Sequence, residues 1–366
     1  MKVLSIFGTR PEAIKMAPVV RELRKRATIK SKVCVTGQHR HMLDQVLNLF
    51  DIWPDYDLNI MTKDQSLSII TVNIIKRLEK IFLEEHFDWV LVHGDTISCM
   101  AASLTAFYHK IKVGHVESGL RTSDKYQPFP EEINRRVCDA IADAHFAPTQ
   151  IAAQNLLKEN ISAESIFVTG NTIIDALMEI SKMNYSFSTG PLSRLPKDKK
   201  IILVTAHRRE NIGEPIINIC KAILELVDNY NDIHIVCPVH LNPNVKSLIY
   251  ELLGCNDKIT LVEPLEYHVW VKLMQKAYFI LTDSGGIQEE APSFGKPVLV
   301  LRNLTERPEG VDAGIIKLVG TETDRIITEC SKLLNDRGEY DSMVKSFIPY
   351  GDGNSAKYIV DIITNA

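Results

Sequence analysis

Short apolar runs alternate with longer amphipathic stretches along the chain, and this alternation predicts its secondary structure. Between most of the runs lie stretches with helical spacing; in residues 13–26, for example, Ile14, Val19 and Leu23 recur near the helical period. A βα repeat of this kind predicts mainly parallel, doubly wound sheets. The runs of strand length are 3–7, 32–36, 89–93, 112–117, 145–148, 165–169, 201–205, 234–238, 259–262, 279–282, 297–301 and 315–319.

The rhythm breaks at residues 184–200, which are rich in Ser, Gly, Pro and Lys and read as a junction or an exposed loop. A chain of 366 residues also exceeds what one hydrophobic core usually serves, about 250–300 residues. We therefore expect an α/β protein with two Rossmann-like, doubly wound domains facing a cleft, residues 1–170 and 171–351. The amphipathic end of the chain, within 352–366, predicts a helix that packs back onto the first domain.

Composition narrows the class of protein. The formal charge is −4, from 42 basic and 46 acidic residues, so nothing favours nucleic acid or an anionic membrane as partner. The N-terminal apolar run 3–7 is far too short for a signal sequence or a membrane span, which predicts a cytoplasmic protein. Seven cysteines without a C-x-x-C pair indicate buried, reduced thiols; neither a disulfide framework nor a metal or other cofactor is expected.

The stretch Ser284–Glu290 has the features of a phosphate site. It follows the apolar run 278–281 and opens a helical pattern. Without side chains, Gly285 and Gly286 let backbone N–H groups approach an anion at the positive end of a helix. The last two residues, both glutamates, are expected in the first helical turn, where one could bind ribose hydroxyls. A nucleotide diphosphate site is predicted; an ordinary glycine-rich turn is the alternative.

Polar segments also follow other predicted strands directly. In open α/β sheets, ligands bind beyond the carboxyl ends of the strands. Polar groups from both halves of the chain are therefore expected to converge on one cleft. The segments are 8–12, 94–96 and 117–121 in the first half and 206–211, 239–240 and 282–290 in the second.

Cations and one histidine are candidates for anion binding. Each cation taken alone could be a solvated surface charge, but guanidinium groups in cleft loops pair well with phosphate oxygens. His207 is flanked by two arginines, which would lower its pKa and favour a neutral ring able to bind phosphate or shuttle a proton. The cations are Arg10, Lys15, Arg208, Arg209 and Arg307.

Carboxylates form the second candidate group: Asp95, Glu117 and Glu131, with Glu132 adjacent to the last. Crowded carboxylates raise one another's pKa, which is how acid/base pairs arise. Residues 127–136 also look like the start of a helix, so stabilisation of the helix dipole fully explains at least one of the two glutamates there. The neighbouring histidines 39 and 41 lack other ligand types and predict a polar loop rather than a metal centre.

Together these motifs resemble the non-hydrolysing UDP-N-acetylglucosamine 2-epimerases. The resemblance covers essentially the whole chain, through segments 8–12, 94–96, 115–121, 129–132, 207–211 and 282–290. It implies the two-domain glycosyltransferase-B arrangement, a homodimer, and interconversion of UDP-N-acetylglucosamine and UDP-N-acetylmannosamine for cell-surface polysaccharide such as capsule. In that reaction UDP is eliminated across C1–C2 to give 2-acetamidoglucal and then adds back with C2 inverted.

The resemblance also implies roles for individual residues. The catalytic set is Asp95, Glu117, Glu131 and His207. Within the UDP-sugar site, the Ser-Gly-Gly segment would hold the diphosphate, Glu290 the ribose and Trp270 the uracil. The cations would bind the phosphates or take part in domain closure. The substrate-binding residues are therefore Arg10, Lys15, Trp270, Ser284, Gly285, Gly286, Glu290 and Arg307.

Substrate-activated members of the family carry a second nucleotide-sugar site. Gln38, His39, Arg209 and His240 match it, whereas Asp64 stands where an arginine is expected, so allosteric activation is a hypothesis here. Three other functions remain open: a hydrolysing 2-epimerase, a UDP-sugar glycosyltransferase of the same fold, and a nucleotide-sugar sensor without catalysis.

Overall fold

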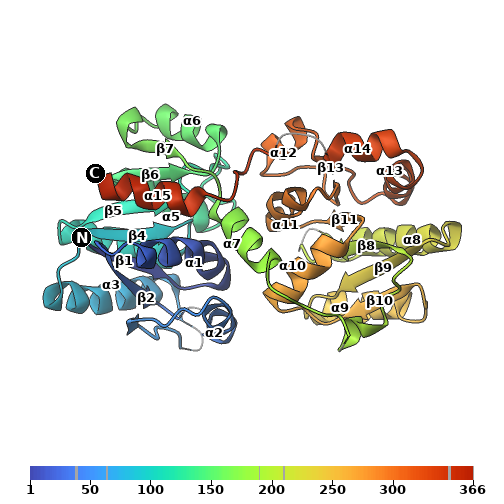
Figure 1. Ribbon diagram of the computed structural model, residues 1–366, viewed down its shortest axis with the longest axis horizontal. Coiled ribbons are helices and arrows are strands. Elements are labelled where there is room, and N and C mark those ends of the chain that lie inside the picture. Colours follow the sequence, from blue (N-terminus) through green and yellow to red (C-terminus); the bar gives the residue numbers. More distant parts are fainter. Residues whose placement is uncertain (38–39, 63–64, 189, 209–210, 345–347, 366) are drawn as a thin grey trace. The chain divides into compact units, whose positions relative to one another are not determined.

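The computed structural model describes residues 1–37, 40–62, 65–188, 190–208, 211–344 and 348–365. The chain forms two compact units: unit 1 is Met1–Met178 with Tyr350–Ala366, and unit 2 is Glu179–Pro349 (Figure 1). The division falls inside helix α7 (Thr172–Ser181) rather than before it, at the expected residue 170. The reason is that most of α7 packs into unit 1, where Leu177 is fully buried.

Unit 1 is built on one parallel sheet, with seven strands among the described residues in the order β3-β2-β1-β4-β5-β6-β7. The expected strands are confirmed to within two residues at each end. Strand β3 was not predicted, because its two residues, Tyr and Asp, form no apolar run. The strands are β1 (Lys2–Phe7), β2 (Lys30–Val35), β3 (Tyr56–Asp57), β4 (Trp89–His93), β5 (Lys112–Val116), β6 (Ala144–Ala147) and β7 (Ile166–Val168).

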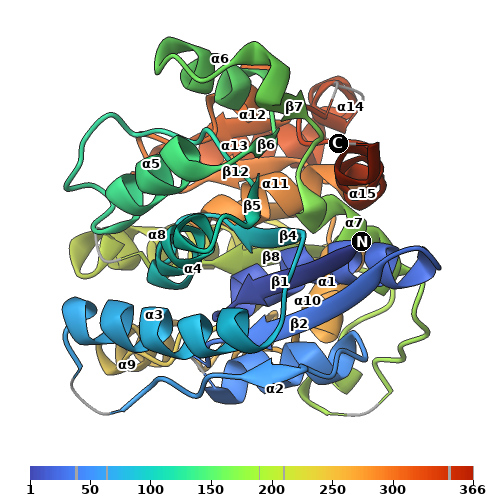
Figure 2. The same cartoon turned by 90° about the vertical axis from the view of Figure 1, so that its left-hand side faces the viewer.

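Helices cover both faces of this sheet. On one face α3, α4 and α5 lie side by side, as Figure 2 shows; on the other, α1 lies between α2 and α15. Helix α1 begins three residues before the expected Ala13, because Thr9 and Glu12 form a capping box around Pro11. The helices are α1 (Arg10–Lys25), α2 (Arg40–Leu49), α3 (Leu67–Glu84), α4 (Ile97–Tyr108), α5 (Glu131–Ile141), α6 (Gln150–Lys158) and α15 (Ser355–Asn365).

Unit 2 repeats this plan with a parallel sheet in the order β10-β9-β8-β11-β12-β13 across its described residues. Both units are thus doubly wound α/β structures, as the alternation predicts. The strands are β8 (Lys200–Thr205), β9 (Ile233–Pro238), β10 (Ile259–Val262), β11 (Phe279–Thr282), β12 (Val298–Val300) and β13 (Ile316–Leu318). The helices are α8 (Glu214–Asn229), α9 (Pro243–Leu253), α10 (Tyr267–Lys276), α11 (Gly285–Glu290), α12 (Pro308–Asp312), α13 (Thr323–Asn335) and α14 (Arg337–Val344).

The apolar side chains of the strands supply the cores. Strands β1 and β4 lie in the middle of their sheet, and Val3, Leu4, Val90 and Leu91 are completely buried. All seven cysteines are free thiols; six are buried, but Cys255 is exposed, contrary to expectation, because it lies in the turn after α9. No helix in the described part of the chain is long and apolar enough to cross a membrane.

Gly119, in the turn after β5, should tolerate no side chain. Its φ is +83°, and a Cβ would lie 2.3 Å from the carbonyl oxygen of Ala152. Replacing Gly119 with alanine is expected to lower the free energy of unfolding by about 3 kcal/mol, because strain and overlap add. Gly190→Ala is the matched control: φ is +74° but no described atom lies within 4 Å, so about 1 kcal/mol is expected. Urea unfolding followed by circular dichroism measures both, and equal losses would contradict the overlap argument.

Candidate active site

Two of the three candidate carboxylates of unit 1 follow neighbouring strands, and the third begins a helix. Asp95 comes two residues after β4, Glu117 comes directly after β5, and Glu131 is the first residue of α5. Because β4 and β5 are parallel neighbours, their carboxyl ends meet at one edge of the sheet. Strand order thus places Asp95 and Glu117 at the same edge.

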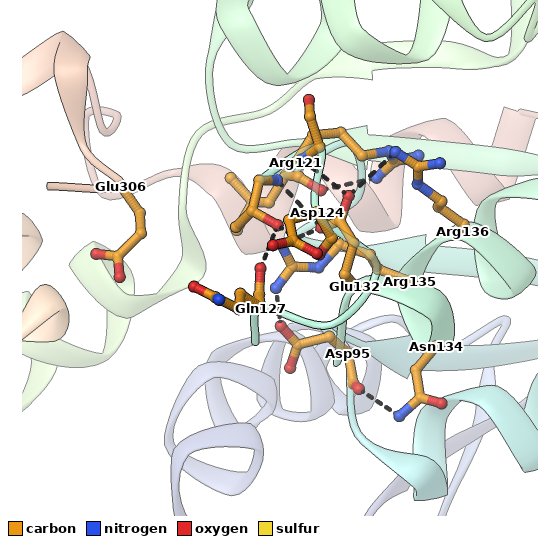
Figure 3. A network of polar contacts seen from close by, with 12 residues as sticks. Asp95, Arg121, Asp124, Gln127, Glu132, Asn134, Arg135, Arg136 and Glu306 are labelled. Carbon is orange, nitrogen blue, oxygen red and sulfur yellow. Dashed lines mark hydrogen bonds and ion pairs between the residues drawn. The ribbon is translucent and has the colours of Figure 1, made fainter. Parts of the chain in front are cut away.

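Asp95 is held by helix α5. Arg135 donates to its carboxylate, and the amide of Asn134 donates to its backbone carbonyl at 2.9 Å. Figure 3 shows both contacts. Arg135 is itself paired with Glu132 at 3.3 Å. The helix that begins with Glu131 therefore also fixes Asp95.

The adjacent glutamates of α5 have different environments. Glu132 is fully buried and accepts backbone N–H groups from Thr122 and Ser123, besides its ion pairs with arginines. In contrast, one carboxylate oxygen of Glu131 is buried with no hydrogen-bond partner among the described residues. Glu132 thus has a complete structural role, whereas Glu131 has an oxygen available for another group.

Glu117 is a buried carboxylate surrounded by donors. Its Oε2 is paired with the ammonium of Lys15, accepts the amide of Asn171 at 3.0 Å, and lies 3.7 Å from Nε2 of His93. Burial alone would raise the pKa of Glu117, but Lys15 and His93 hold it well below its ordinary value. The expectation that crowding raises the pKa values of these carboxylates is therefore wrong for Glu117, because a cation is its nearest partner.

The Arg10-Pro11-Glu12 segment serves the fold as well. Arg10 is the first residue of α1 and is partly buried. Glu12 is buried and accepts the backbone N–H groups of Gly8 and Thr9, at 3.0 and 2.8 Å, and the hydroxyl of Thr96 at 2.7 Å. Glu12 therefore ties the loop after β1 to the loop that carries Asp95.

In unit 2, Ser284 is the N-cap of α11, and Gly285 and Gly286 open the helix. A Cβ on Gly285 would lie 3.6 Å from a guanidinium nitrogen of Arg208 and 3.9 Å from one of Arg307. Two cations and, at 4.0 Å from that Cβ position, a carboxylate oxygen of Glu306 thus lie beside Gly285, which is buried. Gly286 is exposed, and no described atom lies within 4 Å of its Cβ position, so the neighbouring guanidinium groups can pair with an anion there.

The two glutamates of this segment do not lie in the first helical turn, where they were expected. Helix α11 begins at Gly285 and ends at Glu290, so Glu289 and Glu290 lie in its last turn and not in its first. Glu289 pairs with Arg307. Glu290 lies 3.4 Å from the indole nitrogen of Trp270, which donates to it. The glutamates therefore hold side chains of neighbouring elements and do not compensate the helix dipole.

Asp283, which sequence reasoning passed over, organises the loop after β8. It is fully buried, and its Oδ2 accepts the backbone N–H groups of His207 and Arg208, both at 2.8 Å, and the amide of Asn211 at 3.0 Å. Its Oδ1 lies 3.3 Å from Nδ1 of His207. Asp283 thus positions both the histidine and the arginine beside Gly285.

The ring of His207 stacks on that of His240, with centroids 5.6 Å apart and planes 12° from parallel. Burial lowers the pKa of His207; Asp283 opposes this, and His240 and Arg208 lower it further. The expected direction is confirmed, but burial contributes more than the arginine. His240 is exposed. Gln38, His39, Asp64 and Arg209 lie outside the described residues.

The residues that sequence reasoning missed act through other residues. Asn171 and His93 contact Glu117, Arg135 contacts Asp95, and Asp283 holds the loop of His207. Position relative to a strand could have indicated His93, which ends β4, and Asp283, which follows β11. Nothing in the sequence pairs Asn171 with a glutamate 54 positions earlier.

Comparison with known proteins identifies the family of the chain. The sequence model of the UDP-N-acetylglucosamine 2-epimerase family matches residues 21–364. The UDP-N-acetylglucosamine 2-epimerase of Bacillus subtilis is 55% identical over 361 residues, 99% of this chain and 94% of the relative. The crystal structure of UDP-GlcNAc 2-epimerase from Neisseria meningitidis bound to UDP-GlcNAc is 53% identical, with a TM-score of 0.91 and complete coverage of both chains.

A more distant structure supports the fold class alone. The glycosyltransferase SnogD from Streptomyces nogalater is 14% identical, with a TM-score of 0.64 over the whole of this chain. The glycosyltransferase-B-like fold class is thereby confirmed. Since both a family model and close relatives match along nearly the whole sequence, the chain belongs to the UDP-N-acetylglucosamine 2-epimerase family.

Proposed function

We propose that this chain is a non-hydrolysing 2-epimerase that interconverts UDP-N-acetylglucosamine and UDP-N-acetylmannosamine. The observation that carries the proposal is the combination, in one member of this family, of three differently partnered carboxylates in unit 1 and an arginine-flanked glycine in unit 2. Sugar C2 chemistry requires acids and bases, and UDP requires cations and N–H groups.

The proposed reaction has two steps, elimination of UDP and its re-addition. In the first, the C2–H and C1–O bonds break, a C1=C2 double bond forms, a carboxylate takes the proton, and UDP leaves with the electron pair. In the second, UDP adds back to C1 of 2-acetamidoglucal while C2 receives a proton on the opposite face. UDP must therefore stay bound between the two steps, because its escape would end the reaction at the glucal.

Among the carboxylates, Glu131 fits the proton-transfer role best, because one of its oxygens has no partner among the described groups. Asp95 and Glu117 are paired with Arg135 and Lys15, and these ion pairs orient their carboxylates. We assign them to electrostatic stabilisation of the sugar and to proton transfer on its other face.

The UDP end is assigned to unit 2. The hydroxyl of Ser284, the backbone N–H groups of Gly285 and Gly286 and the guanidinium of Arg307 would bind the diphosphate, with His207 as a neutral hydrogen-bond partner. The N–H of Ser284 itself donates to the hydroxyl of Thr282 at 3.0 Å. Glu290 would accept the ribose hydroxyls, and Trp270 beside it would stack on uracil. The contact between Trp270 and Glu290 supports a shared nucleoside site. Arg10 and Lys15 remain candidate phosphate ligands, although Lys15 is paired with Glu117 in this structure.

Phosphorus NMR of a reaction mixture separates this function from its alternatives. With UDP-N-acetylglucosamine alone, we expect two UDP-sugar diphosphate signals to reach equilibrium with little free UDP. A hydrolysing epimerase would release UDP and free N-acetylmannosamine, and a glycosyltransferase would leave the substrate intact until an acceptor is added. Stoichiometric release of UDP would contradict the proposal.

A second nucleotide-sugar site beside the catalytic one remains a proposal, built on Gln38, His39, Arg209 and His240. The stacking of His240 on His207 supports it, since a ligand that moves one ring would move the other. If the site regulates the enzyme, rates with UDP-N-acetylmannosamine alone should show a lag that a trace of UDP-N-acetylglucosamine removes, and His240→Ala should weaken that effect. A hyperbolic rate curve without a lag would count against the site.

We further propose a cytoplasmic homodimer that supplies precursors for capsule-type polysaccharide. The outer face of α3 supports dimerisation, because Leu67, Ile69, Val72 and Leu83 are exposed there in a single chain. Light scattering after size-exclusion chromatography should give twice the mass of one chain, and Ile69→Asp should reduce the measured mass to that of a single chain. A monomeric wild type would contradict the homodimer.

A further inference from the structure

His115, on strand β5, is a fully buried histidine whose two ring nitrogens each face an oxygen acceptor. Nδ1 lies 2.6 Å from a carboxylate oxygen of Asp139, and Nε2 lies 2.7 Å from the carbonyl oxygen of Gly94. A carboxylate and a carbonyl only accept hydrogen bonds, so both nitrogens donate. The contacts therefore require a doubly protonated, cationic ring.

The charges around His115 support this state. The other oxygen of Asp139 accepts from Arg121 at 2.7 Å, so Asp139 is ionised, and Arg121 also pairs with Glu159 at 2.7 Å. Burial alone would lower the pKa of His115, but Asp139 raises it to about 9. Against its own burial, the pKa of Asp139 is lowered to about 2 by His115 and Arg121. Arg136 also pairs with Glu159, at 3.7 Å, so these two carboxylates face three cations.

A metal ion does not fit here, although His115 lies with the thiols of Cys99 and Cys138 in a group whose ligand atoms are within 4.8 Å of one another. A metal needs a lone pair on one ring nitrogen. Both nitrogens of His115 carry hydrogen and donate to oxygen. The thiols are 3.3 Å apart and hydrogen-bond each other.

The contact with Gly94 reaches the candidate active site. Gly94 has a φ of +68° and directly precedes Asp95. The carbonyl of the peptide between them accepts from His115 at 2.7 Å and, more weakly, from the thiol of Cys99 at 3.4 Å. Asn134 and Arg135 hold the carbonyl and the carboxylate of Asp95. Asp139, Asn134 and Arg135 all lie on α5, so His115 ties the Asp95 loop to that helix from the buried side.

We propose that His115 is a positioning residue for the epimerase reaction: its buried cation fixes the carbonyl of Gly94 and, through that peptide, the carboxylate of Asp95. This inference rests on the proposed function of Asp95. His115 does not contact the substrate. It controls the position of the Asp95 carboxylate, and an error of about 1 Å in the position of a catalytic group lowers the rate about a hundredfold.

Two substitutions separate the two ring nitrogens. In His115→Asn the amide lies near the position of Nδ1, so the contact with Asp139 can persist while that with Gly94 is lost. In His115→Gln the amide lies near Nε2 and can still donate to Gly94. We expect kcat to fall about 10- to 100-fold in His115→Asn with KM within about threefold, and to recover to within about fivefold of wild type in His115→Gln.

His145 provides a matched control. It is buried on β6, is paired in register with His115, and lies 2.8 Å from the carbonyl of Asp139. His145→Gln should lower stability but keep kcat within about twofold of wild type. If His115→Asn and His145→Gln lower kcat equally, or if the loss appears only in KM, His115 has no positioning role.

A measurement on the wild-type protein covers the case in which His115→Asn does not fold. With 15N-labelled histidine, and His115→Gln for assignment, both ring nitrogens of His115 should carry protons at pH 7 and lose one only near pH 9. A ring nitrogen without a proton at pH 7 would overturn the proposal. This result does not depend on turnover, so it is distinguishable from a failure of the epimerase function, which the wild-type assay reports.

Discussion

Replacing Glu131 with glutamine is expected to lower kcat about a thousandfold while the unfolding midpoint stays unchanged. The substitution keeps the shape of the side chain but removes its ability to take up a proton, and a positioned acid or base contributes about 10²- to 10⁴-fold. Stability should be unaffected, because one oxygen of Glu131 has no partner among the described residues to lose. Initial rates and urea unfolding measure the two quantities.

The neighbouring glutamate is the control for this prediction. Glu132 is fully buried, accepts two backbone N–H groups and pairs with two arginines. Glu132→Gln should therefore lower the free energy of unfolding by about 3 kcal/mol, because it removes one partner of buried charges. A stable Glu132→Gln together with a destabilised Glu131→Gln would reverse the assigned roles.

Replacing Lys15 with methionine is expected to lower the free energy of unfolding by about 3 kcal/mol at pH 7.5. The side chains of Lys15 and Glu117 are only 13% and 11% exposed, and removing Lys15 leaves the buried carboxylate without its ammonium partner. The double variant Lys15→Met with Glu117→Gln should recover most of the loss, since it removes both charges.

The pH dependence of Lys15→Met follows from Glu117. In the folded wild type the pKa of Glu117 is held below its ordinary value. The pair with Lys15 therefore stabilises the fold fully above the ordinary pKa, and this stabilisation is lost as pH falls through the folded pKa. Without Lys15, only His93 opposes the effect of burial on the pKa of Glu117, so this pKa rises and native Glu117 takes up its proton at a higher pH than in the wild type. The stability difference should therefore shrink between pH 7.5 and pH 5, and an equal difference at both would contradict the pairing.

The fold could be predicted because its signals are local. Each long strand is an apolar run, and each run is followed by a helical pattern, so the doubly wound class is fixed by periodicity. Strand β3 was not predicted because its two residues, Tyr56 and Asp57, are too few to show the alternating pattern of a strand. Helix α11 begins earlier than expected because Gly285 already takes helical geometry, which moves Glu290 into the last turn.

The site could be predicted only in part, because its chemistry depends on contacts between distant positions. Strand ends indicated Asp95, Glu117 and the Ser-Gly-Gly segment. The pKa of Glu117 could not be predicted, since it depends on Lys15, 102 positions away. The anchoring role of Asp283 likewise depends on loop geometry after another strand. Residues that hold other residues leave little trace in a sequence pattern.

Transfer of deuterium to C2 is the most direct test of the proposed reaction. The protein would be incubated with UDP-N-acetylglucosamine in deuterated water and the products followed by proton NMR. Elimination and re-addition of UDP predict C2-deuterated UDP-sugars of both configurations, with little free UDP. Free N-acetylmannosamine, or epimerised product without deuterium at C2, would contradict it.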